Sequence, residues 1–128
     1  MLLGCGPGAD DAPAPPKSTP APTPPPAPAA VPDAAEQAQF IFETRCFTCH
    51  GKQGKGDGPG SAVLNPPPRN FQDAEWQASV TDEHIGQILL YGGIAVGKSP
   101  AMPGNPDLTA KPEVVAALVA YVRGLKSP

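Results

Sequence analysis

The 128-residue sequence has few aromatic residues, no long apolar run and no excess of basic residues. No apolar run approaches the ~18 residues that a membrane-spanning helix needs, so we expect no such helix. The nine basic residues are spread along the chain and the formal net charge is −3, which argues against a nucleic-acid-binding surface. No segment reads as a long strand or as an internal repeat, so we expect a helical fold.

The core that the chain can build is small. All seven aromatic side chains lie in residues 33–128, and eleven of the 20 prolines lie in residues 1–32. Because proline fixes φ and removes a backbone donor, we expect residues 6–32 to be a disordered or polyproline II tether and residues 33–128 to form one folded domain. A Pro-rich ligand for a partner domain is the alternative, but Lys17 is the only basic residue that could flank it.

The pattern of residues 33–128 predicts an all-α fold with three to five helices. Asp33 and Glu36 have the spacing of a capping box, and they begin a helix that we expect to end near Cys46. Ala35, Gln39, Phe42 and Cys46 fall along one side of this helix. Further helices are expected over 73–79, from Thr81 to Gly92, and from Pro112 onward, where a buried stripe comprises Val115, Leu118, Val119, Val122 and Leu125. Residues 51–70 and 92–111 are rich in glycine and proline and are expected to be loops.

Three cysteines cannot all pair in disulfides, and two of them share a motif with a histidine. Cys46, Cys49 and His50 form Cys-x-x-Cys-His, the attachment signature of a c-type haem. Cysteines three residues apart at a helix end can reach the two vinyl groups on one porphyrin edge, and the next residue then places its imidazole under the iron. A structural zinc site would need two more ligands, and His84 and Cys5 are the only other His or Cys residues. A thioredoxin-like pair would need neighbouring strands, and two buried structural cysteines are the third alternative.

A haem iron has two axial positions, so a second ligand is expected. Met102 lies in a loop between Pro100 and Pro103, and we favour it over His84, which begins a helix among charged residues. His/Met ligation raises the reduction potential and leaves no open coordination site, which indicates electron transfer. The apolar macrocycle would also supply core that the aromatic residues lack.

Together these residues resemble the class I c-type cytochromes over 33–128. The resemblance rests on Phe42 four residues before Cys46, the Cys-x-x-Cys-His-Gly run, Gly58-Pro59, Met102-Pro103 and Val-x-Tyr-Val at 119–122. It implies a cytochrome c-like fold in which the first and last helices cross beside one covalent haem c. It also implies that a proline carbonyl, with Pro59 as the candidate and 66–68 as the alternative, accepts a hydrogen bond from His50. By analogy, Arg69 and Trp76 contact the haem propionates.

The third cysteine, Cys5, follows Leu2-Leu3-Gly4 as in the end of a bacterial lipoprotein signal. Residues 1–5 are then the remnant of that signal, and we expect a basic and apolar leader upstream. Bacterial c-type haem attachment takes place outside the cytoplasm, so we expect a periplasmic or extracytoplasmic protein tethered to a membrane through lipidated Cys5. A free N-terminal thiol is the alternative.

These inferences predict a monomeric electron carrier, not an enzyme, that docks transiently on redox protein partners. Residues 33–128 hold 8 basic and 10 acidic residues, a balance of −2, so strong steering toward acidic partners is not expected. An electron-accepting haem subunit of a dehydrogenase or oxidase complex is one alternative. A haem ligand sensor or peroxidase, which needs an accessible iron, is the other.

Overall fold

The first helix begins at the predicted cap. In the computed structural model, which describes Gly4 and residues 32–127, the Asp33 carboxylate accepts the Glu36 N–H at 2.8 Å. Helix α1 (Ala34–Ile41) continues into a π-helical segment (Phe42–Cys46) and then into α2 (Phe47–His50). The predictions for residues 6–31 and for Cys5 lie outside the described residues.

Two details of the first helix differ from expectation. The chain stays helical to His50 instead of ending at Cys46, because Gly51, with a φ of 78°, is the first residue to leave the helix. Ala35 and Gln39 are exposed. The buried side is formed by Ala38, Ile41 and Phe42, the i, i+3, i+4 spacing of one helical stripe.

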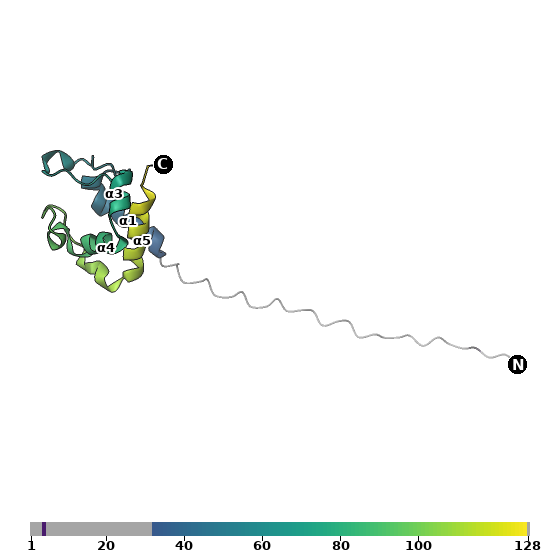
Figure 1. Cartoon of the computed structure of the whole chain (residues 1–128). Helices are drawn as coiled ribbons and strands as arrows, with labels where there is room; N and C mark the ends of the chain where they lie inside the picture. The colour runs from purple at the N-terminus through teal and green to yellow at the C-terminus, as the bar shows by residue number, and fades with distance from the viewer. Residues whose placement is uncertain (1–3, 5–31, 128) are drawn as a thin grey trace. The chain divides into compact units, whose positions relative to one another are not determined.

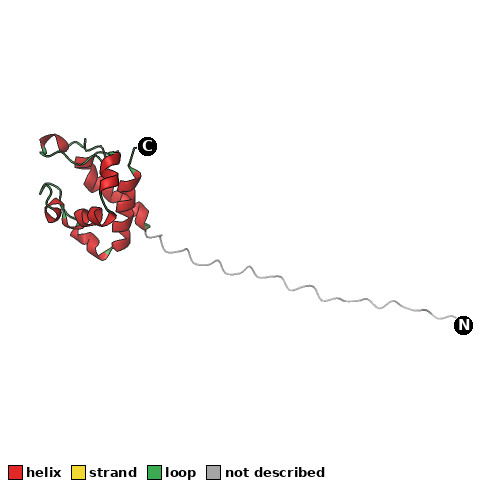
Figure 2. Ribbon diagram, viewed as in Figure 1, coloured by secondary structure: helices red, strands yellow, loops and turns green. Residues whose placement is uncertain are grey.

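The remaining helices lie where caps and periodicity predict them. Asp73 caps α3 (Ala74–Ser79), and Thr81 caps α4 (Asp82–Tyr91), which ends at Gly92. The last helix, α5 (Pro112–Gly124), opens on a proline, which suits the first turn because it needs no N–H there. Short 3₁₀ turns, at Ser61–Val63, Gly93–Val96 and Pro106–Ala110, interrupt the two predicted loops. The fold is all-α, and Figure 2 shows no strand in residues 32–127.

Helix α5 lies at the centre of the packing. It packs against α1, as expected for the first and last helices, and against α4. The core comprises Ala38, Ile41, Ile85, Leu89, Leu108, Val114, Leu118, Val119 and Val122. Val114 was not part of the predicted stripe, whereas Val115 and Leu125 of that stripe are half-buried.

The loops after α2 and after α4 extend on the same side of the domain, away from α5 (Figure 1). Both thiols of the Cys-x-x-Cys-His motif lie in the helical run directly before the first loop, and Met102 lies in the second loop. Within the described residues, none of the helices is both long enough and apolar enough to cross a membrane.

Candidate functional site

One continuous helical run carries all three residues of the motif. Cys46 ends the π-helical segment, and Cys49 and His50 lie in α2. Both thiols are free and half-buried. Burial raises the pKa of the Cys46 thiol to about 11, against the opposing charge of Arg45. This thiol is therefore neutral at pH 7, and the two cysteines would supply the sulfur atoms of thioether bonds to a haem.

The histidine of the motif is buried and has one ring nitrogen engaged. Its side chain is 7% exposed, and Nδ1 lies 3.1 Å from the Arg69 carbonyl oxygen. Burial lowers the pKa of His50, and the bond to the Arg69 carbonyl opposes that shift. When Nδ1 donates to this carbonyl, Nε2 keeps its lone pair, as in a metal-binding histidine.

The second ring nitrogen is open. No buried side-chain nitrogen or oxygen of the described residues lacks a hydrogen-bond partner, and Nδ1 is the nitrogen of His50 that has one. Nε2 of His50 is therefore at accessible surface rather than sealed in the core. A neutral imidazole with an accessible lone pair, directly after two free thiols, fits covalent attachment and ligation of a haem.

The carbonyl beside His50 belongs to Arg69, which corrects the expectation that Pro59 supplies it. Pro59 is exposed and lines a shallow hollow with Phe47 and Lys52. The reason is its position between Gly58 and Gly60, which turn their N–H groups toward α2. The chain returns to the histidine only after the proline run at 66–68.

Three glycines of the 51–70 loop, spaced two residues apart, lie against the end of α2. Each donates its N–H to a carbonyl of that helix: Gly56 to His50 at 2.8 Å, Gly58 to Cys49 at 3.1 Å and Gly60 to Thr48 at 2.7 Å. The carbonyls at a helix C-terminus otherwise lack intrahelical partners. A Cβ on Gly58 would lie 2.4 Å from the carbonyl oxygens of Phe47 and Thr48. Only glycine therefore allows this approach.

An aromatic cluster covers one face of the histidine. The Phe71 ring stacks on the His50 ring with centroids 4.3 Å apart and planes 17° apart. Trp76 packs on Phe71 at 5.4 Å, and the Arg69 guanidinium carbon lies 5.9 Å from the centre of the Trp76 ring. Arg69 and Trp76 are thus close together near His50, and their contact with haem propionates stays a prediction. Phe71 was missed, because the sequence places it 21 residues after His50.

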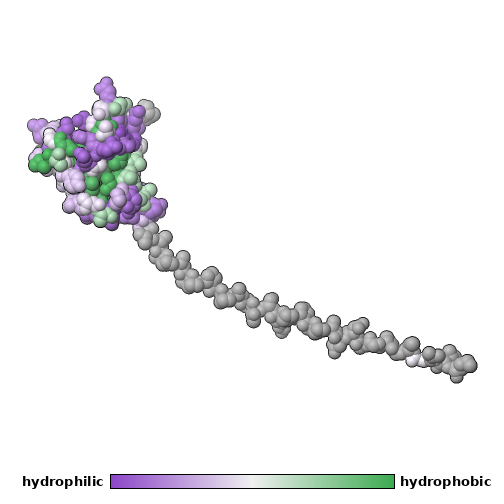
Figure 3. All heavy atoms as spheres, turned by 60° about the horizontal axis from the view of Figure 1, so that its bottom comes forward, coloured by the Kyte–Doolittle hydropathy of each residue, from purple (hydrophilic) through white to green (hydrophobic). Residues whose placement is uncertain are grey.

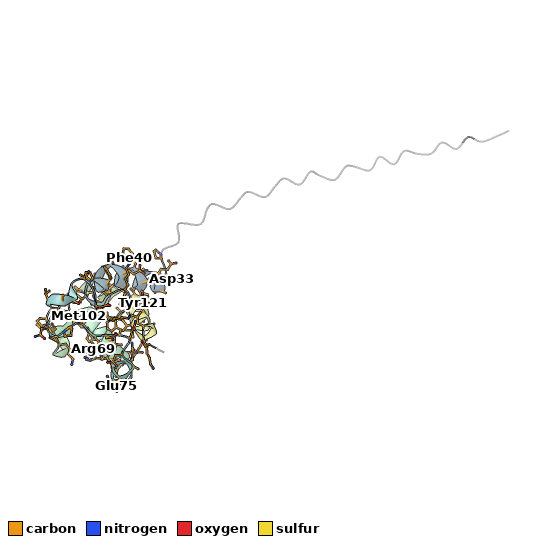
Figure 4. All side chains as sticks on the ribbon, turned by 90° about the horizontal axis from the view of Figure 1, so that it is seen from above. Asp33, Phe40, Arg69, Glu75, Met102 and Tyr121 are labelled. Carbon is orange, nitrogen blue, oxygen red and sulfur yellow. The ribbon has the colours of Figure 1, made fainter. Side chains whose placement is uncertain are left out.

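Met102 is half-buried in the loop after α4. Its carbonyl accepts the Gly93 N–H at 3.0 Å, and its own N–H donates to the Ser99 carbonyl at 3.3 Å. A Cβ on Gly92 would lie 2.7 Å from the Met102 oxygen, so the loop is seated closely on the end of α4. In Figure 4, Met102 and Arg69 lie toward one side of the domain and Asp33 toward the other. The role of Met102 as iron ligand, and its preference over the half-buried His84, stay predictions.

An ion pair links the motif to the segment after Met102. The Arg45 guanidinium donates to both carboxylate oxygens of Asp107 at 3.0 Å and to Oδ1 of Asn105 at 3.1 Å. Asn105 in turn donates from its side chain to the Leu89 carbonyl at 2.8 Å. Residues 60 and 62 positions apart leave no local sequence signal, so this link was not predicted.

The zinc alternative has no support in the described part of the chain. Residues 32–127 contain no group of three or more His, Cys, Asp or Glu side chains that could hold a metal ion. The two thiols and the imidazole are suited to a haem instead.

Comparison with known proteins points the same way. A protein-family model described as cytochrome c matches residues 35–126. The solved structure titled KustC0563 c-type cytochrome is 34% identical to this chain, with a TM-score of 0.55, and the match covers 70% of this chain and 98% of that one. A search of curated proteins found no match.

Proposed function

The chain belongs to the cytochrome c family, and on this basis we propose that it is a single-haem electron carrier with His50 and Met102 as axial iron ligands. Family membership implies haem-based electron transfer and a covalently bound c-type haem. Cys46 and Cys49 would form the two thioethers. The observation that supports this most directly is the neutral, buried imidazole of His50, held at Nδ1 by a carbonyl and open at Nε2.

When bound, the haem iron supplies a one-electron couple. The residues of this chain would hold the haem. The Arg69 carbonyl orients His50 and makes it a more basic ligand. The half-buried thioethers would hold the ring edge against the helix end. With Met102 in the sixth position no site is left for a substrate, so we propose that the protein is not an enzyme.

The absorption spectrum of the haem-loaded protein tests the ligand set. We expect a c-type α band and, in the ferric state, the weak sulfur-to-iron band of methionine ligation. Met102→Ala should abolish the sulfur-to-iron band, and the control His84→Ala should leave it unchanged. If wild type binds carbon monoxide readily and Met102→Ala changes nothing, Met102 is not the ligand. Intact mass should exceed the polypeptide mass by one haem.

The partners are proposed to be redox proteins that bind transiently to a monomer. The domain has a small negative charge and several exposed large apolar side chains: Phe40 at 66%, Val63 at 89%, Tyr91 at 58% and Ile94 at 71%. Figure 3 shows apolar residues at the surface of one face, bordered by hydrophilic ones. Apolar contacts within a small, weakly charged interface are typical of short-lived electron-transfer complexes.

The same exposed apolar side chains favour a second candidate, an electron-accepting haem subunit of a larger dehydrogenase or oxidase complex. Purification from the native membrane under mild detergent separates the two. A carrier elutes alone at the mass of a monomer, whereas a subunit co-elutes at fixed stoichiometry with dehydrogenase or oxidase activity.

We further propose that Cys5 is lipidated, with residues 6–32 as the tether between a bacterial membrane and the domain. The c-type cytochromes are typically extracytoplasmic, and a tether raises the effective concentration of the haem near membrane partners. Cys5→Ser should move the protein from the membrane fraction to the soluble fraction without changing haem content. A variant that stays with the membrane contradicts lipidation at Cys5, and the mass of the N-terminal peptide provides a direct check.

A further inference from the structure

The buried amide of Gln77 has no part in the haem chemistry described so far. Gln77 is 5% exposed. Nε2 donates to the Phe71 carbonyl at 2.8 Å and to the Val122 carbonyl at 2.9 Å. Oε1 accepts from the Arg123 guanidinium at 3.1 Å. A buried amide is costly unless it is satisfied in this way, so Gln77 is fixed in position by three partners.

The same arrangement fixes the backbone of Phe71 from both sides. Its N–H donates to the Gly54 carbonyl at 2.7 Å, and its carbonyl accepts from Gln77. The peptide groups on either side of its Cα are therefore both tied, one to the loop after α2 and one to α3. This fixes the backbone position from which the Phe71 ring extends toward His50.

The segment 69–71 contacts the imidazole of His50 in two independent ways. The Arg69 carbonyl bonds to Nδ1 at the edge of the ring. The Phe71 ring covers one face, 4.3 Å away and nearly parallel. The hydrogen bond at the ring edge fixes the direction in which Nδ1 points, and the stacked Phe71 ring fixes the plane of the imidazole. Together the two contacts fix the orientation of the His50 ring.

Arg123 anchors this assembly from α5. Besides Gln77 Oε1, it donates to the carbonyls of Gln77 and Val80 at 2.5 and 2.6 Å and to Asp82 at 2.8 Å. Residues of α3, α4 and α5 thus hold Gln77, which holds Phe71.

We propose that Phe71, held by Gln77, is a positioning residue that fixes the imidazole plane of His50 and thereby tunes the reduction potential of the iron. The inference rests on the proposed function, since it takes His50 as an iron ligand. A hydrogen bond to the second ring nitrogen raises the basicity of a ligating histidine and so favours the oxidised metal. Loosening segment 69–71 weakens this bond and raises the potential.

The experiment compares haem-loaded wild type with three variants. Gln77→Met keeps the length of the side chain and removes both N–H donors. Phe71→Leu keeps an apolar group and removes the stacked ring, and Phe71→Tyr keeps the ring. Val119→Ala, in α5 and 8% exposed, is the control for loss of stability alone. The readouts are the reduction potential, the electron paramagnetic resonance spectrum of the ferric low-spin haem, and the melting temperature.

We expect Gln77→Met and Phe71→Leu to raise the potential and broaden the ferric resonance, because the imidazole then samples several orientations. Phe71→Tyr, which keeps the stacked ring, should leave the potential and the resonance close to those of wild type. Val119→Ala should lower the melting temperature only.

If Phe71 and Gln77 have only a structural role, Gln77→Met and Phe71→Leu should lower the melting temperature and leave the potential and the resonance unchanged. That result overturns the inference. A lowered potential in these variants overturns it as well. A wild-type resonance without the signature of histidine ligation overturns the proposed ligand set instead. The two failures are therefore distinguishable.

Discussion

At the scale of single residues, the site depends on where a side chain is missing as much as on where one is present. The glycine at position 58 lets a loop reach the carbonyls at the end of α2, and the stacked ring of Phe71 occupies the next layer around His50. Gly58 donates to the carbonyl of Cys49 and Phe71 stacks on His50, so the two features act on neighbouring residues of the motif.

Gly58→Ala should destabilise the haem-loaded protein by about 1–3 kcal/mol. The added Cβ would lie 2.4 Å from two backbone oxygens, which cannot move as the end of a flexible side chain could. Chemical denaturation of the haem-loaded protein measures the free energy of unfolding.

The matched control is Gly86→Ala. Gly86 lies within α4, and its nearest neighbour to an added Cβ, Val115, is 3.8 Å away. Alanine there should stabilise by about 0.5–1 kcal/mol, because it restricts the unfolded chain. Equal effects of the two substitutions would contradict the close approach at Gly58.

Sequence reasoning located the motif but not its surroundings. Cys46, Cys49 and His50 are recognisable because their chemistry requires a fixed local spacing. Arg69 was predicted as a haem contact, whereas its carbonyl, 19 residues from His50, is what the structure places on the ring. Gln77 acts across 45 residues on Val122, and no local pattern marks a glutamine as buried.

At the scale of elements, capping residues predicted where helices begin and end better than apolar spacing predicted which side chains are buried. The bounds of α3, α4 and α5 follow from Asp73, Thr81, Gly92 and Pro112, which act on the adjacent backbone. Of the four residues that share one side of the first helix, Phe42 is buried and Ala35 and Gln39 are exposed, and the π-helical segment was not foreseen. A π-helical turn depends on tertiary packing and is common at functional sites, so a 3.6-residue period does not reveal it.

The contact between α1 and α5 should carry much of the stability. Leu118, on α5, is 0% exposed, and Leu118→Ala should cost about 2–5 kcal/mol because it leaves a cavity. Val63→Ala is the control, since that side chain is 89% exposed and such substitutions usually change stability by less than about 0.5 kcal/mol. Thermal unfolding of both variants in the haem-loaded form provides the comparison.

The ion pair between Arg45 and Asp107 should make stability depend on acid pH. Hydrogen bonding from Arg45 holds the pKa of Asp107 below its ordinary value. A depressed carboxyl pKa stabilises the fold above the unfolded-state pKa, and this contribution is lost as pH falls through the folded-state value.

We therefore expect the melting temperature of wild type to fall more steeply than that of Asp107→Asn below about pH 4. Arg45→Gln should flatten the profile in the same way, because it removes the other half of the pair. Parallel profiles in all three proteins would show that the pair contributes nothing.

At the scale of the whole molecule, the domain has little core without its cofactor. Phe42 is the one aromatic side chain in the buried core of the described residues, and the rest of that core is aliphatic. A protein of this size buries a limited fraction of its surface, and an apolar macrocycle extends the core.

Protein produced without haem attachment should therefore lack a cooperative melting transition and lose most of its helicity. Far-ultraviolet circular dichroism and calorimetry measure both, with the haem-loaded protein as control. Native helicity and a sharp transition in the haem-free protein would show that the side chains suffice.

The helical run that begins at the Asp33 cap also sets the path by which a pull on the preceding chain would reach the motif. Cys46 lies 13 residues further along the same helical run, a distance of ~20 Å at ~1.5 Å per residue. Any anchor on the preceding segment acts on one end of this rod, and the thiols occupy the other. Because the Asp33 cap and the bond from the Gln37 amide to the Pro32 carbonyl fix the first turn, a pull on the chain before Asp33 would reach the motif only along this helical run.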